Sequence, residues 1–219
     1  MHELKKQNDT LVIDIGAQIG QFTLFAAKLG HHVICVEPFI DNVVRLHKAI
    51  GKESLQDRVT LVQNAIFNKR NQIKMLSRNP TNIGGQSLVP HKDLVFKWDS
   101  SNKYLVETIL FDDLVDLIPK RDDGSEYEKA VLKIDIEGFE QYAFQRASHI
   151  FDKLNFVAIF MEWGNLREPR LDRDGLVLSL KSFFVSRNYR PMSLDDYDEP
   201  IDIRFHDKWP MDIVWIKAN

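Results

Sequence analysis

Short apolar runs alternate with stretches of helical spacing along most of the chain. Runs rich in β-branched residues predict strands at residues 11–15, 32–36, 59–63, 130–135, 156–161 and 212–217, and a further terminal strand is expected at residues 190–193. Apolar residues at intervals of three and four predict helices at residues 22–29, 41–50, 139–147 and 174–184. Asp41 and Asp174 are candidate N-caps, and Gly30 and Gly51 are candidate C-terminal stops.

This order of strands and helices predicts an α/β fold. Strands that alternate with helices favour a parallel sheet covered by helices on both faces. Only a loop joins the last two strands, so one of them is expected to be antiparallel. Residues 70–111 break the alternation with short, partly alternating strands and a turn region rich in Pro, Asn and Gly, which indicates an inserted β-rich segment. The length of 219 residues fits one domain over residues 1–219.

Composition and charge narrow the function classes. The chain is 44% hydrophobic and 28% charged, which excludes a disordered protein. Its net charge of −3 gives no sign of a nucleic-acid partner. No apolar run is long enough to span a bilayer, no secretory signal is evident, and the single cysteine, Cys35, lies in an apolar run. We therefore expect a cytoplasmic protein, while a luminal or membrane-anchored full-length form stays open, and the oligomeric state is unknown.

The first predicted strand runs into a glycine-containing turn. Gly16 would let the backbone approach a ligand, and Gly20 would let the following helix pack close to the strand. Glu37 ends the second strand, where a carboxylate can accept hydrogen bonds from both ribose hydroxyls. Asp14 would repel a pyrophosphate but suits a cationic ligand, although Asp14 and the glycines could instead only shape a tight turn.

This strand–turn–helix arrangement occurs in the binding sites of two classes of cofactor, dinucleotides and S-adenosylmethionine. The dinucleotide fingerprint requires Gly-x-Gly-x-x-Gly, and Gln18 and Gln21 stand at its second and third glycine positions. S-adenosylmethionine has no phosphate and carries positive charge, so it is favoured. An NAD-dependent oxidoreductase is the first alternative, and an inactive binding module with the same fold is the second.

Further polar residues follow other strands at the same expected edge of the sheet. Asn64 and Ala65 would border an adenine, or form an ordinary turn. Asp135 ends the fourth strand of the alternating series and would face the donor. Glu140 is interpreted mainly as a favourable charge at a helix N-terminus.

Five segments in order resemble the FkbM family of S-adenosylmethionine-dependent methyltransferases. They are residues 12–20 (VIDIGAQIG), 36–38 (VEP), 82–88 (NIGGQSL), 106–114 (VETILFDDL) and 132–140 (LKIDIEGFE). The resemblance covers roughly residues 10–165. One small departure is Gln18, which stands where the family usually has Asn.

The resemblance implies a Rossmann-like class I methyltransferase with a seven-stranded, mostly parallel sheet. It also implies O-methylation of a hydroxyl on a sugar or another small metabolite. The residues that it assigns to S-adenosylmethionine, together with their neighbours in the same segments, are Asp14, Gly16, Ala17, Gln18, Gly20, Glu37, Pro38, Asn64, Ala65 and Asp135.

A hydroxyl acceptor must lose a proton, so a nearby base is expected. Asp135 is the first candidate, followed by Glu137 and then Glu162, which ends the next strand. The inserted segment is expected to build the acceptor side. The expected substrate-binding residues are Gly84, Gly85, Ser87 and Trp163, although Glu162 and Trp163 could equally be a surface acid beside a packed indole.

We expect no metal ion, because the sequence has no tight metal-ligand spacing. A metal-assisted alternative would use oxygen ligands from Asp135, Glu162 and Asn165.

Overall fold

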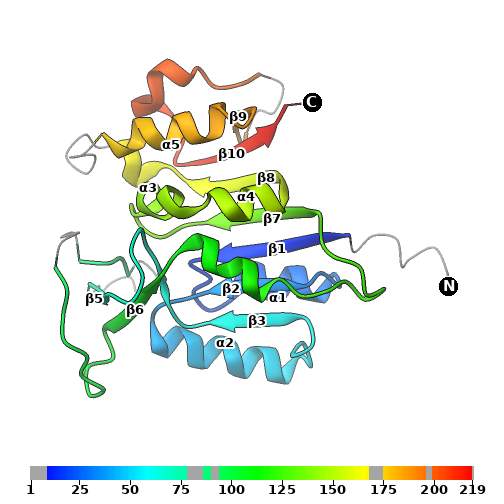
Figure 1. The fold of residues 1–219 in the computed structure, drawn as a ribbon, viewed down its shortest axis with the longest axis vertical. Helices are drawn as coiled ribbons and strands as arrows, with labels where there is room; N and C mark the ends of the chain where they lie inside the picture. Colours follow the sequence, from blue (N-terminus) through cyan, green and yellow to red (C-terminus); the bar gives the residue numbers. More distant parts are fainter. Residues whose placement is uncertain (1–8, 78–85, 90–93, 168–174, 196–198, 219) are drawn as a thin grey trace.

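A seven-stranded sheet forms the centre of the protein in a computed structural model, which describes residues 9–77, 86–89, 94–167, 175–195 and 199–218 (Figure 1). The strand order is β3-β2-β1-β7-β8-β10-β9. The strands are β1 (Thr10–Ile15), β2 (Val33–Val36), β3 (Val59–Val62), β7 (Lys129–Ile134), β8 (Asn155–Glu162), β9 (Tyr189–Ser193) and β10 (Asp212–Lys217). Neighbours from β3 to β8 pair in parallel, whereas β10 is antiparallel to both β8 and β9, which confirms the prediction of one antiparallel strand.

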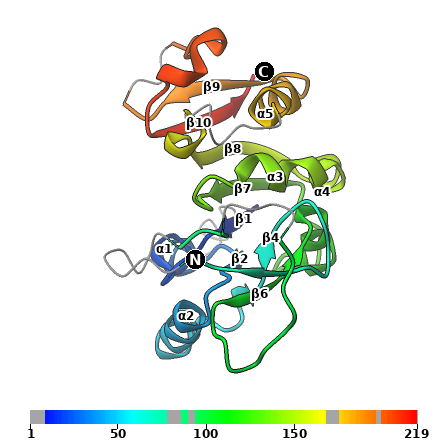
Figure 2. The same cartoon turned by 90° about the vertical axis from the view of Figure 1, so that its left-hand side faces the viewer.

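Helices cover both faces of this sheet (Figure 2). On one face lie α1 (Gln21–Lys28) and α2 (Ile40–Lys52), and on the other lie α3 (Glu140–Ala143), α4 (Ser148–Lys153) and α5 (Leu176–Val185). Short 3-10 helices are η2 (Phe111–Leu117), η3 (Phe144–Arg146), η4 (Gly164–Arg167) and η5 (Ile203–Lys208). Alternate residues of β1 serve the two layers: Leu11, Ile13 and Ile15 join the larger core under α3–α5, and Val12 packs toward α1 and α2.

The inserted segment forms a small second sheet of order β4-β6-β5. Its strands are β4 (Ala65–Ile66), β5 (Ile73–Met75) and β6 (Leu105–Ile109), and an isolated bridge pairs Leu76 with Leu88. The segment lies beyond the carboxyl ends of the parallel strands, where their arrowheads point in Figure 1. This position lets it form one wall of a ligand site.

Some predicted helix boundaries are wrong. Gly51 lies inside α2, and the helix begins after Phe39, so Asp41 belongs to the first turn rather than the cap. The helix expected at residues 139–147 divides into α3 and η3, and α4 follows after a non-helical Ala147 (φ −127°). Asp174 lies outside the described residues. Within those residues, every helix is too short or too polar to cross a membrane.

Candidate active site

A cavity of about 340 Å³ opens at the carboxyl ends of β1, β2 and β7. This volume lies within the roughly 300–1,000 Å³ typical of small-molecule sites. Most predicted donor residues line it, namely Gly16, Ala17, Gln18, Glu37, Pro38, Asn64, Ala65 and Asp135. Open parallel sheets bind ligands at this edge, so the structure brings these residues together where a nucleoside can bind.

The turn after β1 is fixed by tight backbone geometry. Gly16 has φ +79°, and a Cβ at this position would lie 1.9 Å from the carbonyl O of Asp135. Gln18 also has a positive φ, 52°, and its N–H donates a 2.8 Å hydrogen bond to Glu37 Oε2. The turn therefore connects the ends of three strands, β1, β2 and β7.

Glu37 is buried at the end of β2. Its Oε1 accepts hydrogen bonds from the Phe39 N–H at 2.9 Å and from Asn42 Nδ2 at 3.2 Å, in addition to the Gln18 bond to Oε2. Burial raises the pKa of Glu37, and these hydrogen bonds act against that shift. Each carboxylate oxygen can accept about two hydrogen bonds, which leaves Oε2 able to accept a further donor from a ligand.

Two residues predicted to bind the donor have structural roles instead. Asp14 is fully buried on the α1 side of β1, and its Oδ2 accepts hydrogen bonds from the Thr23 N–H and Oγ1 at 3.1 and 2.7 Å. It does not line the cavity, so the alternative that Asp14 shapes the turn is the one the structure favours. A Cβ on Gly20 would come within 2.2 Å of Leu46 Cδ1, so Gly20 permits α1 to pack on α2 rather than on the strand.

Asn64 and Ala65 lie where the cavity meets the inserted segment. The Asn64 Nδ2 donates a 3.1 Å hydrogen bond to the carbonyl O of Glu107, which orients the side chain. Ala65 belongs to β4 and is buried. Apolar side chains of Ile66, Leu76, Leu88 and Phe139 continue this wall.

Sequence reasoning missed Lys133, which lies at the centre of the site. Its Nζ donates a 2.7 Å hydrogen bond to the carbonyl O of Gly16 and lies 3.6 Å from Asp14 Oδ1 and 3.8 Å from Asp135 Oδ2. Lys133 pairs directly with Asp14 across β1 and β7. The available signal was the two-residue spacing from Lys133 to Asp135, which places both on the same side of an extended chain.

Three carboxylates predicted to be catalytic gather where β7 and β8 end: Asp135 and Glu137 follow β7, and Glu162 is the last residue of β8. Asn165 Nδ2 donates hydrogen bonds to Glu137 Oε2 at 3.3 Å and to Glu162 Oε2 at 2.9 Å. Burial and the neighbouring charges of Asp135 and Glu137 raise the pKa of Glu162 to about 7. Burial and the charge of Asp135 also raise the pKa of Glu137, whose backbone has φ 57°. A non-glycine residue in this conformation indicates a turn held by its surroundings.

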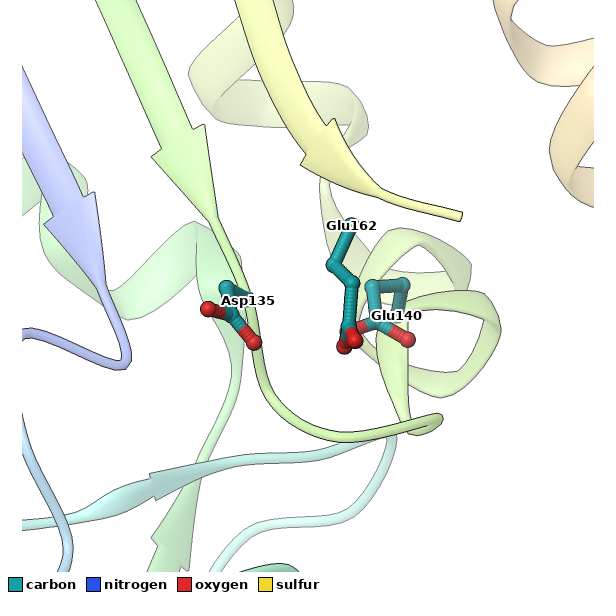
Figure 3. A group of neighbouring side chains, drawn as sticks. All are labelled: Asp135, Glu140 and Glu162. Atoms are coloured by element: carbon teal, nitrogen blue, oxygen red, sulfur yellow. The ribbon is translucent and has the colours of Figure 1, made fainter. Parts of the chain in front are cut away.

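Glu140 lies in the first turn of α3, as expected for a charge at a helix N-terminus, and it is also a buried member of the same group. Its side chain has no exposed surface, and its Oε1 accepts a 2.9 Å hydrogen bond from the Ile136 N–H. Burial raises the pKa of Glu140 to about 8. Oxygens of Asp135, Glu140 and Glu162 all lie within 4.8 Å of one another, between the ends of β7 and β8 and the start of α3 (Figure 3).

The predicted acceptor residues are less closely grouped. Ser87 lines the donor cavity, whereas Gly84 and Gly85 lie outside the described residues. Trp163 is fully buried beside Trp209 and Trp215, and its Nε1 donates a hydrogen bond to the carbonyl O of His206. The expectation that Trp163 binds the acceptor is therefore wrong, because its indole has no surface to offer.

A second cavity of about 690 Å³ lies on the α1 side of the sheet. Its walls are mainly apolar and include Phe25 and Leu29 of α1 and Phe160 of β8. Its charged lining residues include Glu162 and Asp212. Three residues, Phe22, Lys133 and Asp135, line both cavities, so the two spaces meet at these side chains.

Comparison with solved structures finds similar chain folds at low identity. An rRNA methylase from Streptococcus thermophilus aligns with TM-score 0.46 and 11% identity, covering 99% of this chain and 92% of that chain. A Streptococcus mutans protein described as a methyltransferase, in complex with SAH, aligns with TM-score 0.48 and 10% identity, covering 96% and 90%. Precorrin-6y C5,15-methyltransferase from Geobacter metallireducens GS-15 aligns with TM-score 0.43 and 12% identity, covering 97% and 81%. No curated protein sequence matches the chain.

The sequence profile of the methyltransferase FkbM domain matches residues 14–191, which is most of the chain. This match confirms the family expected from the five segments and replaces the NAD-dependent alternative. The seven-stranded sheet is the class I methyltransferase fold expected for the family. The chain belongs to the FkbM family of methyltransferases, whose methyl donor is S-adenosylmethionine.

Proposed function

We propose that the protein is an O-methyltransferase that acts on a hydroxyl of a small metabolite or glycan. The observation that carries this proposal is the position of Asp135, which lines both the donor cavity and the second cavity. A methyl group passes between donor and acceptor where their sites meet. A carboxylate at that junction can accept a proton, which a hydroxyl acceptor must lose.

The residues of the first cavity fit S-adenosylmethionine in chemistry. Glu37 offers acceptors for ribose hydroxyls, and the apolar wall that includes Ile66 and Phe139 suits an adenine. Lys133 and Asp135 offer opposite charges for the ends of an amino acid. When bound, S-adenosylmethionine supplies a methyl group activated by a positively charged sulfur.

The protein's own residues then have three tasks. Gly16 and Gln18 hold the turn that shapes the donor cavity, and Phe22 lies at the junction, where it would exclude water. Asp135 accepts the hydroxyl proton as the acceptor oxygen gains the methyl group. Glu137 and Glu162 remain the second and third candidates for the base. The acidic surroundings oppose a phosphate-rich nucleic acid as the acceptor.

The test is methyl transfer from radiolabelled S-adenosylmethionine to separated small-metabolite, glycan and RNA fractions. We expect an alkali-stable methyl ether in a metabolite or glycan fraction. Asp135→Asn should reduce turnover far more than it reduces affinity for S-adenosylhomocysteine, the demethylated donor, and equal losses in both would count against a role in proton transfer. The proposal would be refuted if the radiolabelled methyl group appeared only in RNA or only on nitrogen atoms. It would also be refuted if Asp135→Asn turned over as fast as the wild type. Donor binding with no transfer to any fraction would favour the inactive binding module.

A further inference from the structure

Glu140 differs from Asp135, Glu137 and Glu162 in having a buried oxygen with no hydrogen-bond partner among the described residues. Its side chain has no exposed surface, and Oε1 is occupied by the Ile136 N–H. Oε2 is also buried, and no hydrogen-bond donor reaches it within the part of the chain that the structure describes. Leaving such an oxygen unpaired is costly, so most buried polar atoms in proteins have a partner. A partner for Oε2 would have to be small enough to fit among carboxylates.

The surrounding carboxylates have the spacing of a cation site. Asp135, Glu140 and Glu162 each offer one oxygen, and these oxygens lie within 4.8 Å of one another (Figure 3). Calcium binds oxygens at about 2.3–2.6 Å, so two ligands on opposite sides of the ion are roughly 4.6–5.2 Å apart. Magnesium, at about 2.0–2.1 Å, would draw opposite ligands to roughly 4.0–4.2 Å. One ion of either kind can therefore contact all three residues with little movement.

The charges of this cluster are only partly balanced. Lys133 lies 3.8 Å from Asp135, but its Nζ donates to the carbonyl O of Gly16 and also faces Asp14. Neither Glu140 nor Glu162 forms an ion pair with a basic residue in the described ranges. Asn165 gives Glu162 a neutral amide hydrogen bond. A divalent cation would supply the positive charge that neither Glu140 nor Glu162 receives from a basic residue of the described ranges.

We propose that Asp135, Glu140 and Glu162 bind a hard divalent cation, Mg²⁺ or Ca²⁺. All three ligands are carboxylate oxygens, which these ions prefer over the softer transition metals. Asp135 and Glu162 also line the second cavity, so the open side of the ion faces that space. If the proposed function holds, the ion would bind the acceptor oxygen and make its proton more acidic. One Asp135 oxygen would then bind the ion, and the other would accept the proton.

The site is tested by metal binding, which needs no acceptor. Protein treated with a chelator is titrated with MgCl₂, CaCl₂ and MnCl₂ at constant ionic strength, followed by thermal unfolding and calorimetry. We expect saturable stabilisation of the wild type. Glu140→Gln keeps the size of the side chain and an acceptor for the Ile136 N–H, and it should weaken metal affinity by about tenfold or more. Asp212→Asn is the matched control, because Asp212 adds charge beside Asp135 but is outside the ligand set.

The outcomes separate this inference from the proposed function. An absence of binding up to about 10 mM, above the roughly 10⁻³ M dissociation constants of weak calcium sites, would overturn the metal site. Equal weakening by Glu140→Gln and Asp212→Asn would also overturn it, because it would indicate a diffuse charge effect. Affinity for S-adenosylhomocysteine is measured in the same samples. Donor binding without metal binding would reject the cation alone, and metal binding without hydroxyl methylation would reject only the O-methyltransferase.

Discussion

Gly16 and Asp135 are in direct backbone contact at the centre of the site. The Asp135 N–H donates a 3.1 Å hydrogen bond to the carbonyl O of Ile15, and a Cβ added to Gly16 would lie 1.9 Å from the Asp135 carbonyl O. The donor turn and the proposed base therefore keep their relative position through the main chain. A side chain at position 16 would force either the donor turn or the backbone of Asp135 to move.

Gly16→Ala should both destabilise the protein and impair donor binding. The substitution adds a steric clash with backbone to the cost of about 1–2 kcal/mol for a left-handed alanine. Gly124→Ala is the matched control, because Gly124 also has positive φ (+83°) but nothing within 4 Å of the added Cβ. Urea unfolding should show a larger loss for Gly16→Ala than for Gly124→Ala. Equal losses would mean that the clash at Gly16 relaxes freely.

Much of the fold follows from local patterns in the sequence. β-Branched runs marked the strands of the large sheet other than β9, because a strand buried between two helical layers needs apolar residues along its length. The helix α4 was not predicted, because its six residues are too few to show a clear helical repeat. Gly51 was misread because it tolerates a helix interior when the helix packs well on the sheet.

The site was predicted less completely, for reasons that depend on tertiary packing. Asp14 is a strand-end acid like Asp135, but the return of α1 over the sheet buries it against Thr23. Glu140 was correctly expected in the first turn of a helix, but its burial depends on the packing of α3 in the folded protein. Trp163 lies next to a site acid in sequence, yet tryptophans from distant segments enclose it. Sequence distance gives no measure of these contacts.

Glu37→Gln should weaken binding of S-adenosylhomocysteine by about 1–3 kcal/mol, or roughly 5- to 150-fold. The amide loses the negative charge and presents an N–H group toward one of the N–H donors of Gln18 or Phe39. Isothermal titration calorimetry measures the change. Glu53→Gln, at an exposed ion pair with Lys28, should leave donor affinity unchanged. An affinity of folded Glu37→Gln within twofold of the wild type would remove Glu37 from the donor site.

Trp163→Phe should reduce stability without affecting ligand binding. The change removes the Nε1 hydrogen bond to the His206 carbonyl O and leaves space in the core, which should cost about 1–3 kcal/mol. Trp98→Phe is the control, since Trp98 is 59% exposed and should change stability by less than about 0.5 kcal/mol. Unfolding curves and calorimetry with S-adenosylhomocysteine give both quantities. If a well-folded Trp163→Phe lost donor affinity, Trp163 would have to contribute to ligand binding after all.

Cys35 should be unreactive in the folded protein. The residue is fully buried in β2, and burial together with the nearby charge of Asp14 raises the pKa of its thiol to about 12. At mildly alkaline pH, far below that value, almost no thiolate forms, and the thiolate is the reactive species. Iodoacetamide labelling followed by mass spectrometry should leave the native protein unmodified and fully label the unfolded protein. Equal labelling rates would show that β2 opens readily.

Asp14 and Lys133 should be energetically coupled in a double-mutant cycle. Lys133→Met leaves the fully buried Asp14 carboxylate without its cation, and removal of one partner from a buried pair costs about 3–5 kcal/mol. Asp14→Asn retains an acceptor for Thr23, so in the Asp14→Asn background Lys133→Met should cost less, giving a coupling of about 1–3 kcal/mol in urea unfolding. The exposed pair of Lys129 and Asp9, at 3.2 Å, involves the same strand and should show coupling below about 1 kcal/mol. Similar coupling in both pairs would mean that burial adds nothing, and that Lys133 serves Asp135 and the ligand rather than the folded chain.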